Sequence, residues 1–204
     1  DLSGKKFIDM SMMGIGTNIL GYGNKFVDKA VKKVVADGNM STLNCPEEVE
    51  LAEKLLALHP WAGMVKLARS GGEANAIAIR IARAATGKDK VAICGYHGWH
   101  DWYLSSNLTK SNSLKNHLLP GLSTDGVPKN LKNTVYAFNY NDLEGFKKII
   151  NKNKISMVFM EVTRNFAPKN GFLRKIRQIT KQKNIVLIFD ECTSGFRETY
   201  GGIF

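Results

Sequence analysis

The sequence has few cysteines and no long apolar run. The first feature argues against a disulfide-rich or zinc-binding protein, and the second against a membrane-spanning one. Its three cysteines, Cys45, Cys94 and Cys192, are too few and too scattered for a disulfide framework or a paired-cysteine zinc site. We therefore expect reduced thiols in a cytoplasmic protein. No apolar stretch approaches the roughly 20 residues that a membrane-spanning helix needs. The visible start also lacks a signal-peptide pattern, so we expect no membrane partner.

Two nucleotide-binding fingerprints are missing as well. The apolar run 185–189 followed by Asp190 has the form of a Walker B acid, but no segment supplies the matching GxxxxGK[ST] loop. Segment 16–21 has the glycine spacing of that loop without its lysine, and no GxGxxG follows a predicted strand. Asp190 must then pair with another group that stabilises a buried anion, such as a protonated ring nitrogen.

The net charge of +11 raises the possibility of a nucleic-acid partner. The basic residues are mostly lysines on predicted helix faces, for example Lys147, Lys148 and Lys152. The interleaving of arginine with aromatic residues that serves base stacking is absent. We interpret the charge as solvated surface that attracts small anions, and expect no nucleic acid. Binding that survives moderate salt would favour the nucleic-acid alternative.

What the sequence contains is a regular alternation of strands and helices. Strands such as 155–160 and 185–189 are continuous apolar runs, which is typical of a mostly parallel sheet covered on both faces. We therefore predict an α/β fold. The predicted helices span 24–37, 46–58, about 73–86, 142–151 and 172–183, and the predicted strands span 64–68, 90–94, 134–138, 155–161 and 185–190. We expect irregular chain from Gly95 to about Leu131, within which 107–128 is a functional or mobile flap.

In such a sheet, ligands bind outside the carboxyl ends of the strands. One such end leads into Ser70-Gly71-Gly72-Glu73, which has the form of a helix capping box. Two glycines in a first helical turn cost roughly 1 kcal/mol each relative to alanine. They leave bare backbone N–H groups at a helix N-terminus, which favours a phosphate site over a cap alone.

A second strand end carries Cys94, Tyr96, His97, His100 and Asp101. Their spacing matches no common zinc pattern, and we predict no metal. Tyr96 and His97 are better suited to stacking on a flat ring and to hydrogen bonding.

Three segments together resemble a known family: Ser70–Asn75, Tyr96–Asp101 and Asp190–Arg197. They are similar to the class III aminotransferases, which depend on pyridoxal 5'-phosphate (PLP), and most of all to the glutamate-1-semialdehyde 2,1-aminomutase branch. The resemblance runs in order along essentially the whole chain. It implies the large domain of a fold-type-I PLP enzyme and a homodimer. It also implies amino-group transfer on an amino acid or an amino/keto substrate, between two molecules or within one.

The resemblance implies a role for each candidate site residue. Gly71 and Gly72, with Ser70, would hold the cofactor phosphate, and Asp190 would pair with the ring nitrogen. The remaining contacts would be made by Tyr96 on one ring face with His97 beside it, Cys192 on the other face, and Glu161 and Asn165 on the side of the ring hydroxyl.

The chain departs from the family pattern at several positions. The family commonly has threonine at the position of Gly72 and valine at that of Cys192. Arg164 points to a sub-branch with a different substrate. The Schiff-base lysine would lie beyond Phe204, so that a degenerate, non-catalytic binding module is the alternative function.

The ends of the chain lead us to expect part of a longer protein. We predict that residues 1–45 lead into the large domain and that residues 46–204 form its cofactor-binding part. That part would lack the lysine region and the C-terminal small domain.

Overall fold

The computed structural model describes residues 1–11, 13–40, 42–117, 121–163 and 165–203. The chain divides into two compact units, Asp1–Val65 and Lys66–Phe204. The domain boundary predicted at residue 46 stays a prediction.

The first unit contains two helices, α1 (Lys25–Asp37) and α2 (Pro46–Leu58). Both occupy the ranges predicted from their sequence. The side chain of Asn24 caps α1 by accepting hydrogen bonds from the backbone N–H groups of Phe26 and Val27. Neither helix buries a residue.

The second unit is built on a four-stranded sheet with the order β2-β1-β3-β4, in which every pair is parallel. The strands are β1 (Val91–Cys94), β2 (Val135–Ala137), β3 (Met157–Glu161) and β4 (Val186–Asp190). Every residue of β1 and of β3 is buried. The prediction of a parallel sheet covered on both faces is confirmed.

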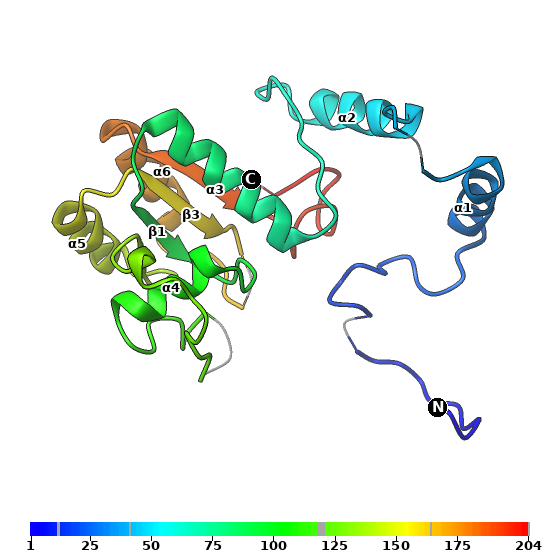
Figure 1. Cartoon of the computed structure of the whole chain (residues 1–204), viewed down its shortest axis with the longest axis horizontal. Helices are drawn as coiled ribbons and strands as arrows, with labels where there is room; N and C mark the ends of the chain where they lie inside the picture. Colours follow the sequence, from blue (N-terminus) through cyan, green and yellow to red (C-terminus); the bar gives the residue numbers. More distant parts are fainter. Residues whose placement is uncertain (12, 41, 118–120, 164, 204) are drawn as a thin grey trace. The chain divides into compact units, whose positions relative to one another are not determined.

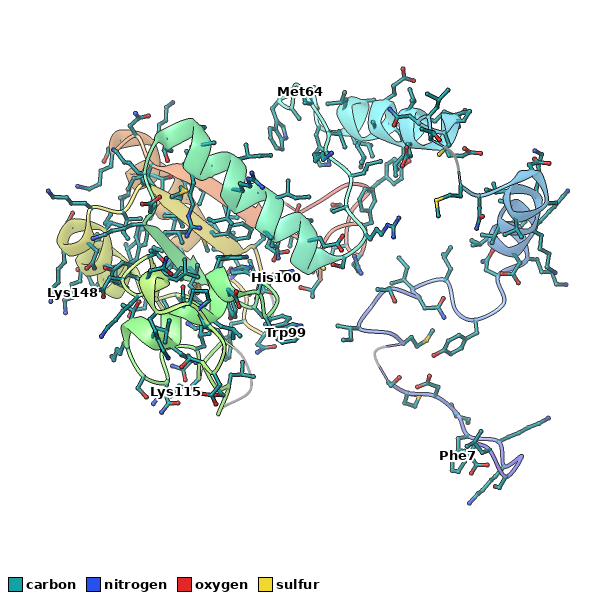
Figure 2. All side chains as sticks on the ribbon, viewed as in Figure 1. Phe7, Met64, Trp99, His100, Lys115 and Lys148 are labelled. Carbon is teal, nitrogen blue, oxygen red and sulfur yellow. The ribbon has the colours of Figure 1, made fainter. Side chains whose placement is uncertain are left out.

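Helices cover both faces of this sheet (Figure 1). On one face, α3 (Gly71–Thr86) and α4 (Asp101–Thr109) pack on alternate strand residues such as Ile93 and Phe159. On the other face, α5 (Leu143–Asn153) and α6 (Phe172–Gln182) pack on the residues between them, such as Ala92 and Met160. Lysines lie on the outer sides of α5 and α6, as Lys148 does on α5 (Figure 2). All helices in the described ranges are too short or too polar to span a bilayer.

The strand predicted at Met64–Ala68 is wrong. These residues form no strand, and the side chain of Met64 is 90% exposed (Figure 2). A strand needs a neighbour for its backbone hydrogen bonds. Residues 64–68 pair with none of the four strands of the sheet.

The prediction of irregular chain from Gly95 to Leu131 is also wrong in part. This stretch contains α4 and a short 3-10 helix, η1 (Lys129–Leu131). The five consecutive residues Trp102–Ser106 of α4 are all buried. A helix buried all round shows no 3.6-residue alternation of apolar and polar residues, so its period could not be recognised. The predicted flap therefore begins within the last turn of α4, and residues 118–120 of it lie outside the described residues.

Candidate functional site

The carboxyl ends of β1, β3 and β4 bring the predicted site residues to one edge of the sheet. Glu161 at the end of β3 is in register with Asp190 at the end of β4, and Cys94 at the end of β1 is in register with Met160. Because neighbouring strands lie about 4.8 Å apart, residues separated by many positions in the sequence become direct neighbours here.

The N-terminus of α3 opens at this edge. The hydroxyl of Ser70 accepts a hydrogen bond from the N–H of Glu73 at 3.3 Å, and the Glu73 carboxylate accepts one from the N–H of Arg69 at 2.9 Å. The predicted cap is therefore present, with the return bond one residue earlier than in the usual box. The first N–H groups of a helix have no acceptor within the helix, which leaves those of Gly71 and Gly72 for a ligand.

Asp190 accepts three hydrogen bonds, and it is only 6% exposed. Its Oδ2 lies 2.8 Å from Nδ1 of His97 and accepts a 2.9 Å bond from Nδ2 of Asn75. Its Oδ1 accepts a 2.9 Å bond from the N–H of Cys192. Burial by itself would raise the pKa of Asp190, but the bonds from His97, Cys192 and Asn75 outweigh it and lower that pKa. The carboxyl group is therefore ionised at neutral pH.

His97 is completely buried behind Asp190. Its ring lies against Phe159, with centroids 4.7 Å apart, and is stacked over Trp102 at 6.4 Å. Since the Asp190 carboxylate only accepts hydrogen bonds, Nδ1 of His97 is the nitrogen that carries the proton. Nε2 of His97 is buried and has no hydrogen-bond partner among the described residues.

Asn75 belongs to the site, although its role was not recognised from the sequence. It lies on the inner side of α3, is buried, and donates to a residue 115 positions away. Asparagine is a poor helix former. An asparagine inside a helix that otherwise turns alanine and isoleucine toward the core was the signal that could have identified it.

Three side chains hold the turn that presents Tyr96 and His97. Nδ1 of His117 accepts a hydrogen bond from the N–H of Gly95 at 3.2 Å. The hydroxyl of Tyr103 donates to the Gly95 carbonyl at 2.8 Å, and Oε2 of Glu161 accepts from the N–H of Tyr96 at 3.1 Å. Gly95 has a φ of +124°, and a Cβ there would collide with the Glu161 side chain. Only glycine fits this position without strain.

Six of the nine predicted site residues line two hollows, whereas Gly72, Tyr96 and His97 line neither of them. The Asp190 hollow has a volume of about 530 Å³, and its lining includes Ser70, Gly71, Asn75, Asp190 and Cys192. At this hollow, the backbone at the start of α3 lies very close to neighbouring side chains. A Cβ on Gly71 would lie 2.9 Å from Sγ of Cys192. At the neighbouring residue, a Cβ on Gly72 would lie 2.7 Å from Cε1 of His100.

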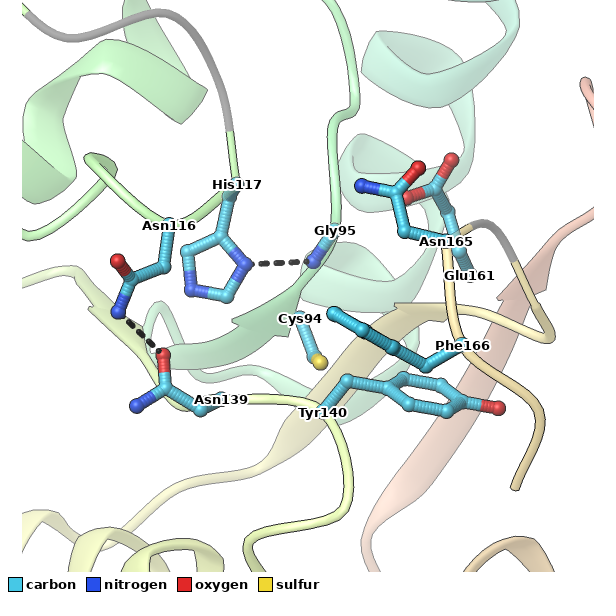
Figure 3. A pocket seen from close by; sticks show the side chains of 9 residues that line it. All are labelled: Cys94, Gly95, Asn116, His117, Asn139, Tyr140, Glu161, Asn165 and Phe166. Atoms are coloured by element: carbon cyan, nitrogen blue, oxygen red, sulfur yellow. Dashed lines mark hydrogen bonds between the residues drawn. The ribbon is translucent and has the colours of Figure 1, made fainter.

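The Glu161 hollow is the second one, with a volume of about 450 Å³ (Figure 3). Its lining residues come from the ends of β1 and β3 and from three loops: Cys94, Gly95, Asn116, His117, Asn139, Tyr140, Glu161, Asn165 and Phe166. Asn165 thus lines the same hollow as Glu161, but it does not line the Asp190 hollow, and the predicted contact of both residues with the ring hydroxyl stays a prediction. Arg164, the residue we associated with a sub-branch, lies outside the described residues.

The acidic and histidine side chains do not form a metal site in the part of the chain that the structure describes. No three Cys, His, Asp or Glu side chains gather there in a way that could hold an ion. The three cysteines are free.

Known proteins are similar to this chain in sequence and in architecture. The chain is 36% identical, over 99% of its length and 47% of the relative's, to the 3-aminobutyryl-CoA aminotransferase of Cloacimonas acidaminovorans. It is 38% identical, over 92% of its length and 44% of the relative's, to the glutamate-1-semialdehyde 2,1-aminomutase of Cytophaga hutchinsonii. A solved transaminase with PLP bound superposes with a TM-score of 0.80 at 25% identity, over 94% of this chain and 45% of that one.

The chain thus spans about half the length of the curated relatives that it matches. The sequence model described as aminotransferase class-III matches residues 1–204, the whole chain. The resemblance carried by the three motifs is confirmed, and the chain belongs to the class-III aminotransferase family.

Proposed function

We propose that the protein to which this chain belongs transfers amino groups with PLP, acting on an amino acid or an amino/keto substrate. The observation that carries the proposal is Asp190, a buried carboxylate kept ionised by three donors at the carboxyl edge of the sheet. A carboxylate has about four acceptor positions. Three of them are used in Asp190, so that one on Oδ1 remains for the N–H of a pyridinium ring.

The other residues predicted for the site also fit the cofactor. The N–H groups of Gly71 and Gly72 at the start of α3 would hold its phosphate, with the dipole of the helix in support. Tyr96 and Cys192 would lie on the two faces of the ring. Glu161 and Asn165 would lie on the side of the ring hydroxyl. PLP, when bound, supplies an electron sink for the carbanion of the substrate. Asp190 would keep the ring nitrogen protonated.

The first test is the Asp190→Asn variant of the full-length protein. Its amide keeps the shape of the carboxylate but carries no charge. We expect the rate of amino transfer to fall by on the order of 10²- to 10³-fold, the usual cost of one preorganised electrostatic contact. PLP should still bind through its phosphate, as measured by its absorbance after gel filtration. Full activity of the variant would refute the assigned role of Asp190.

We also propose that the lysine that binds the cofactor covalently is not among residues 1–204. In support, no lysine is found among the described residues that line the two hollows. Borohydride reduction of the full-length enzyme with PLP, followed by peptide mapping, should label a lysine outside this range. A label on a lysine of residues 1–204 would contradict the proposal, and so would a failure to label any lysine.

The relatives leave two reactions to be distinguished, transfer between molecules and transfer within one. The residues described here serve both, because the phosphate, the ring nitrogen and the ring faces are held alike. Release of a free keto product after one half-reaction of the intact enzyme would establish transfer between molecules. Retention of the keto intermediate until the isomeric amine forms would establish the aminomutase reaction.

We also propose that the protein to which this chain belongs is a homodimer and is located in the cytoplasm. The apolar side chains Phe26, Val31 and Val35 of α1 are exposed in the first unit, which is consistent with a surface covered by a second subunit. The three free cysteines are consistent with a reducing compartment. Light scattering of the full-length enzyme should give twice the monomer mass, and fractionation should recover the protein in the cytoplasm. A monomer, or recovery from another compartment, would contradict the corresponding statement.

A further inference from the structure

Asn75 is a polar side chain on the buried side of α3. The other buried residues of this helix, Ile79 and Ala82, pack in the apolar cluster on one face of the sheet. Burying an amide costs free energy unless its polar atoms find partners. Nδ2 of Asn75 has such a partner, Oδ2 of Asp190, at 2.9 Å. The carboxylate at the end of β4 therefore explains why a buried position of α3 carries an amide.

The Asp190 carboxylate is held from three separate parts of the chain. Asn75 reaches it from α3, His97 from the loop between β1 and α4, and the N–H of Cys192 from the segment after β4. His97 and Asn75 both bond to Oδ2, whereas Cys192 bonds to Oδ1. Two donors on one oxygen and one on the other fix the plane of the carboxylate. The acceptor position that remains lies on Oδ1.

His97 and Asn75 affect Asp190 in different ways. Burial raises the pKa of Asp190, the hydrogen bond from His97 is the largest contribution that lowers it, and the bond from Asn75 is the smallest. His97 therefore accounts for the charge of the carboxylate, and Asn75 mainly for its position. An amide donates a hydrogen bond without adding charge. A lysine or arginine at this position would neutralise Asp190 and so weaken its attraction for a protonated ring nitrogen.

Asn75 also connects the two places at which the cofactor would be anchored. It lies four residues after Gly71, roughly 6 Å further along the axis of α3. The first turn of α3 offers the N–H groups proposed for the phosphate, and the next turn carries the amide that holds Asp190. Because both lie on one helix, the geometry of that helix sets the spacing between the phosphate site and the carboxylate.

We propose that Asn75 is a positioning residue for the ring nitrogen of the cofactor. Its amide holds Oδ2 of Asp190, so that Oδ1 is presented to the ring nitrogen at a fixed distance from the phosphate site. Asn75 acts through Asp190 rather than through a contact of its own with the cofactor. The proposal rests on the proposed function, because it requires PLP to bind with its ring nitrogen at Asp190.

The experiment compares the binding of PLP with that of the analogue in which a C–H group replaces the ring nitrogen. The analogue keeps the phosphate and the aldehyde but offers no N–H to Asp190. Fluorescence titration of the full-length protein, freed of its cofactor, gives Kd for each compound. The wild type should prefer PLP, and Asn75→Leu should reduce this preference by about tenfold, a usual coupling between neighbouring groups. Asn75→Ala removes the same donor without adding bulk and should give the same loss. An unchanged preference in both variants would overturn the proposal.

The Ile79→Ala variant separates the hydrogen bond of Asn75 from the packing of α3. Ile79 lies one turn further along the helix on the same buried side, and its side chain is 2% exposed. Its truncation should loosen the helix and weaken the binding of both compounds alike, which leaves the preference for PLP as in the wild type. A loss of preference as large as in Asn75→Leu would mean that packing sets it, and would refute the role of the amide.

The wild type distinguishes failure of this proposal from failure of the proposed function. Equal affinity of the wild type for PLP and the analogue would refute the contact between Asp190 and the ring nitrogen, on which the proposed function rests. A wild type that prefers PLP, with Asn75→Leu and Asn75→Ala equally selective, would refute the role of Asn75 alone.

The melting temperature in acid provides a readout without cofactor. It should fall about as steeply below pH 4 in Asn75→Leu as in the wild type, because His97 still lowers the pKa of Asp190. A clearly shallower fall would mean that Asn75 sets the charge of Asp190 rather than its position, and would also overturn the proposal.

Discussion

The imidazole of His97 and the carboxylate of Asp190 form a buried pair, with Nδ1 and Oδ2 2.8 Å apart and neither side chain more than slightly exposed. The two residues are 93 positions apart in the sequence. Among the groups that lower the pKa of Asp190, the hydrogen bond from His97 makes the largest contribution. The pair therefore keeps a negative charge available at the edge of the sheet despite its burial.

The coupling between these two residues can be measured with a double-mutant cycle. His97→Leu and Asp190→Asn should each destabilise the full-length protein, but their combination should cost less than the sum. We expect a coupling of about 1.5–3 kcal/mol, the range for a hydrogen bond to a charged group. Thermal or denaturant unfolding of the four proteins gives the value. Strict additivity would show that the pair contributes nothing.

The stability of the fold should depend on Asp190 in acid. A group with a lowered folded-state pKa stabilises the protein above its unfolded-state pKa, which is about 3.9 for aspartate. That contribution is lost as the pH falls through the folded-state value. The difference in melting temperature between the wild type and Asp190→Asn should be constant above about pH 4 and shrink below it. The exposed Asp37→Asn serves as the control, and a difference that stays constant down to pH 2 would refute this expectation.

Cys94 should be the least reactive of the three thiols. It is buried, and burial together with Glu161 raises its pKa, so that little of the reactive thiolate forms. Cys192 is exposed and Cys45 is half-buried. Iodoacetamide labelling at pH 8, followed by mass spectrometry, should modify Cys192 and Cys45 well before Cys94. Labelling of Cys94 at the rate of Cys192 in the folded protein would contradict the prediction.

The raised pKa of Cys94 also affects the stability of the protein at alkaline pH. Cys94 has a raised folded-state pKa, so its stabilising contribution is complete below the unfolded-state value of about 8.5 and is lost as the pH rises above it. Cys94→Ala should remove this loss, although it costs packing at every pH. The melting temperature should therefore fall less steeply between pH 7 and pH 10 in the variant than in the wild type. An equal fall in both proteins would refute the prediction.

Gly72 at the start of α3 lies close to the ring of His100, and this predicts the effect of adding a methyl group at Gly72. In Gly72→Ala the new Cβ would lie 2.7 Å from the ring of His100, so the ring or the helix start must move. We expect the full-length enzyme to lose about 1–3 kcal/mol of PLP binding, roughly 5- to 150-fold in affinity. Fluorescence titration with PLP measures this change. Gly63→Ala, where a Cβ meets nothing within 4 Å, should bind PLP normally.

The sequence alone determined the parallel α/β architecture and the edge of the sheet at which the site lies. The continuous apolar runs of β3 and β4 predict strands buried on both faces, and polar residues at their ends mark the carboxyl edge. Ser70, with two glycines after it, predicts a helix start with free N–H groups. These signals are local, because each depends on residues that follow one another in the chain.

The tertiary structure decided the features that depend on contacts between distant residues. It showed that Asn75 donates to Asp190, that His117 holds Gly95, and that Glu161 and Asn165 line a hollow of their own. It also showed the buried helix α4, whose apolar and polar residues follow no period. A sequence pattern records which side of an element is buried, but not the partner that buries it. These contacts follow from the order and register of the four strands, and only the folded chain fixes both.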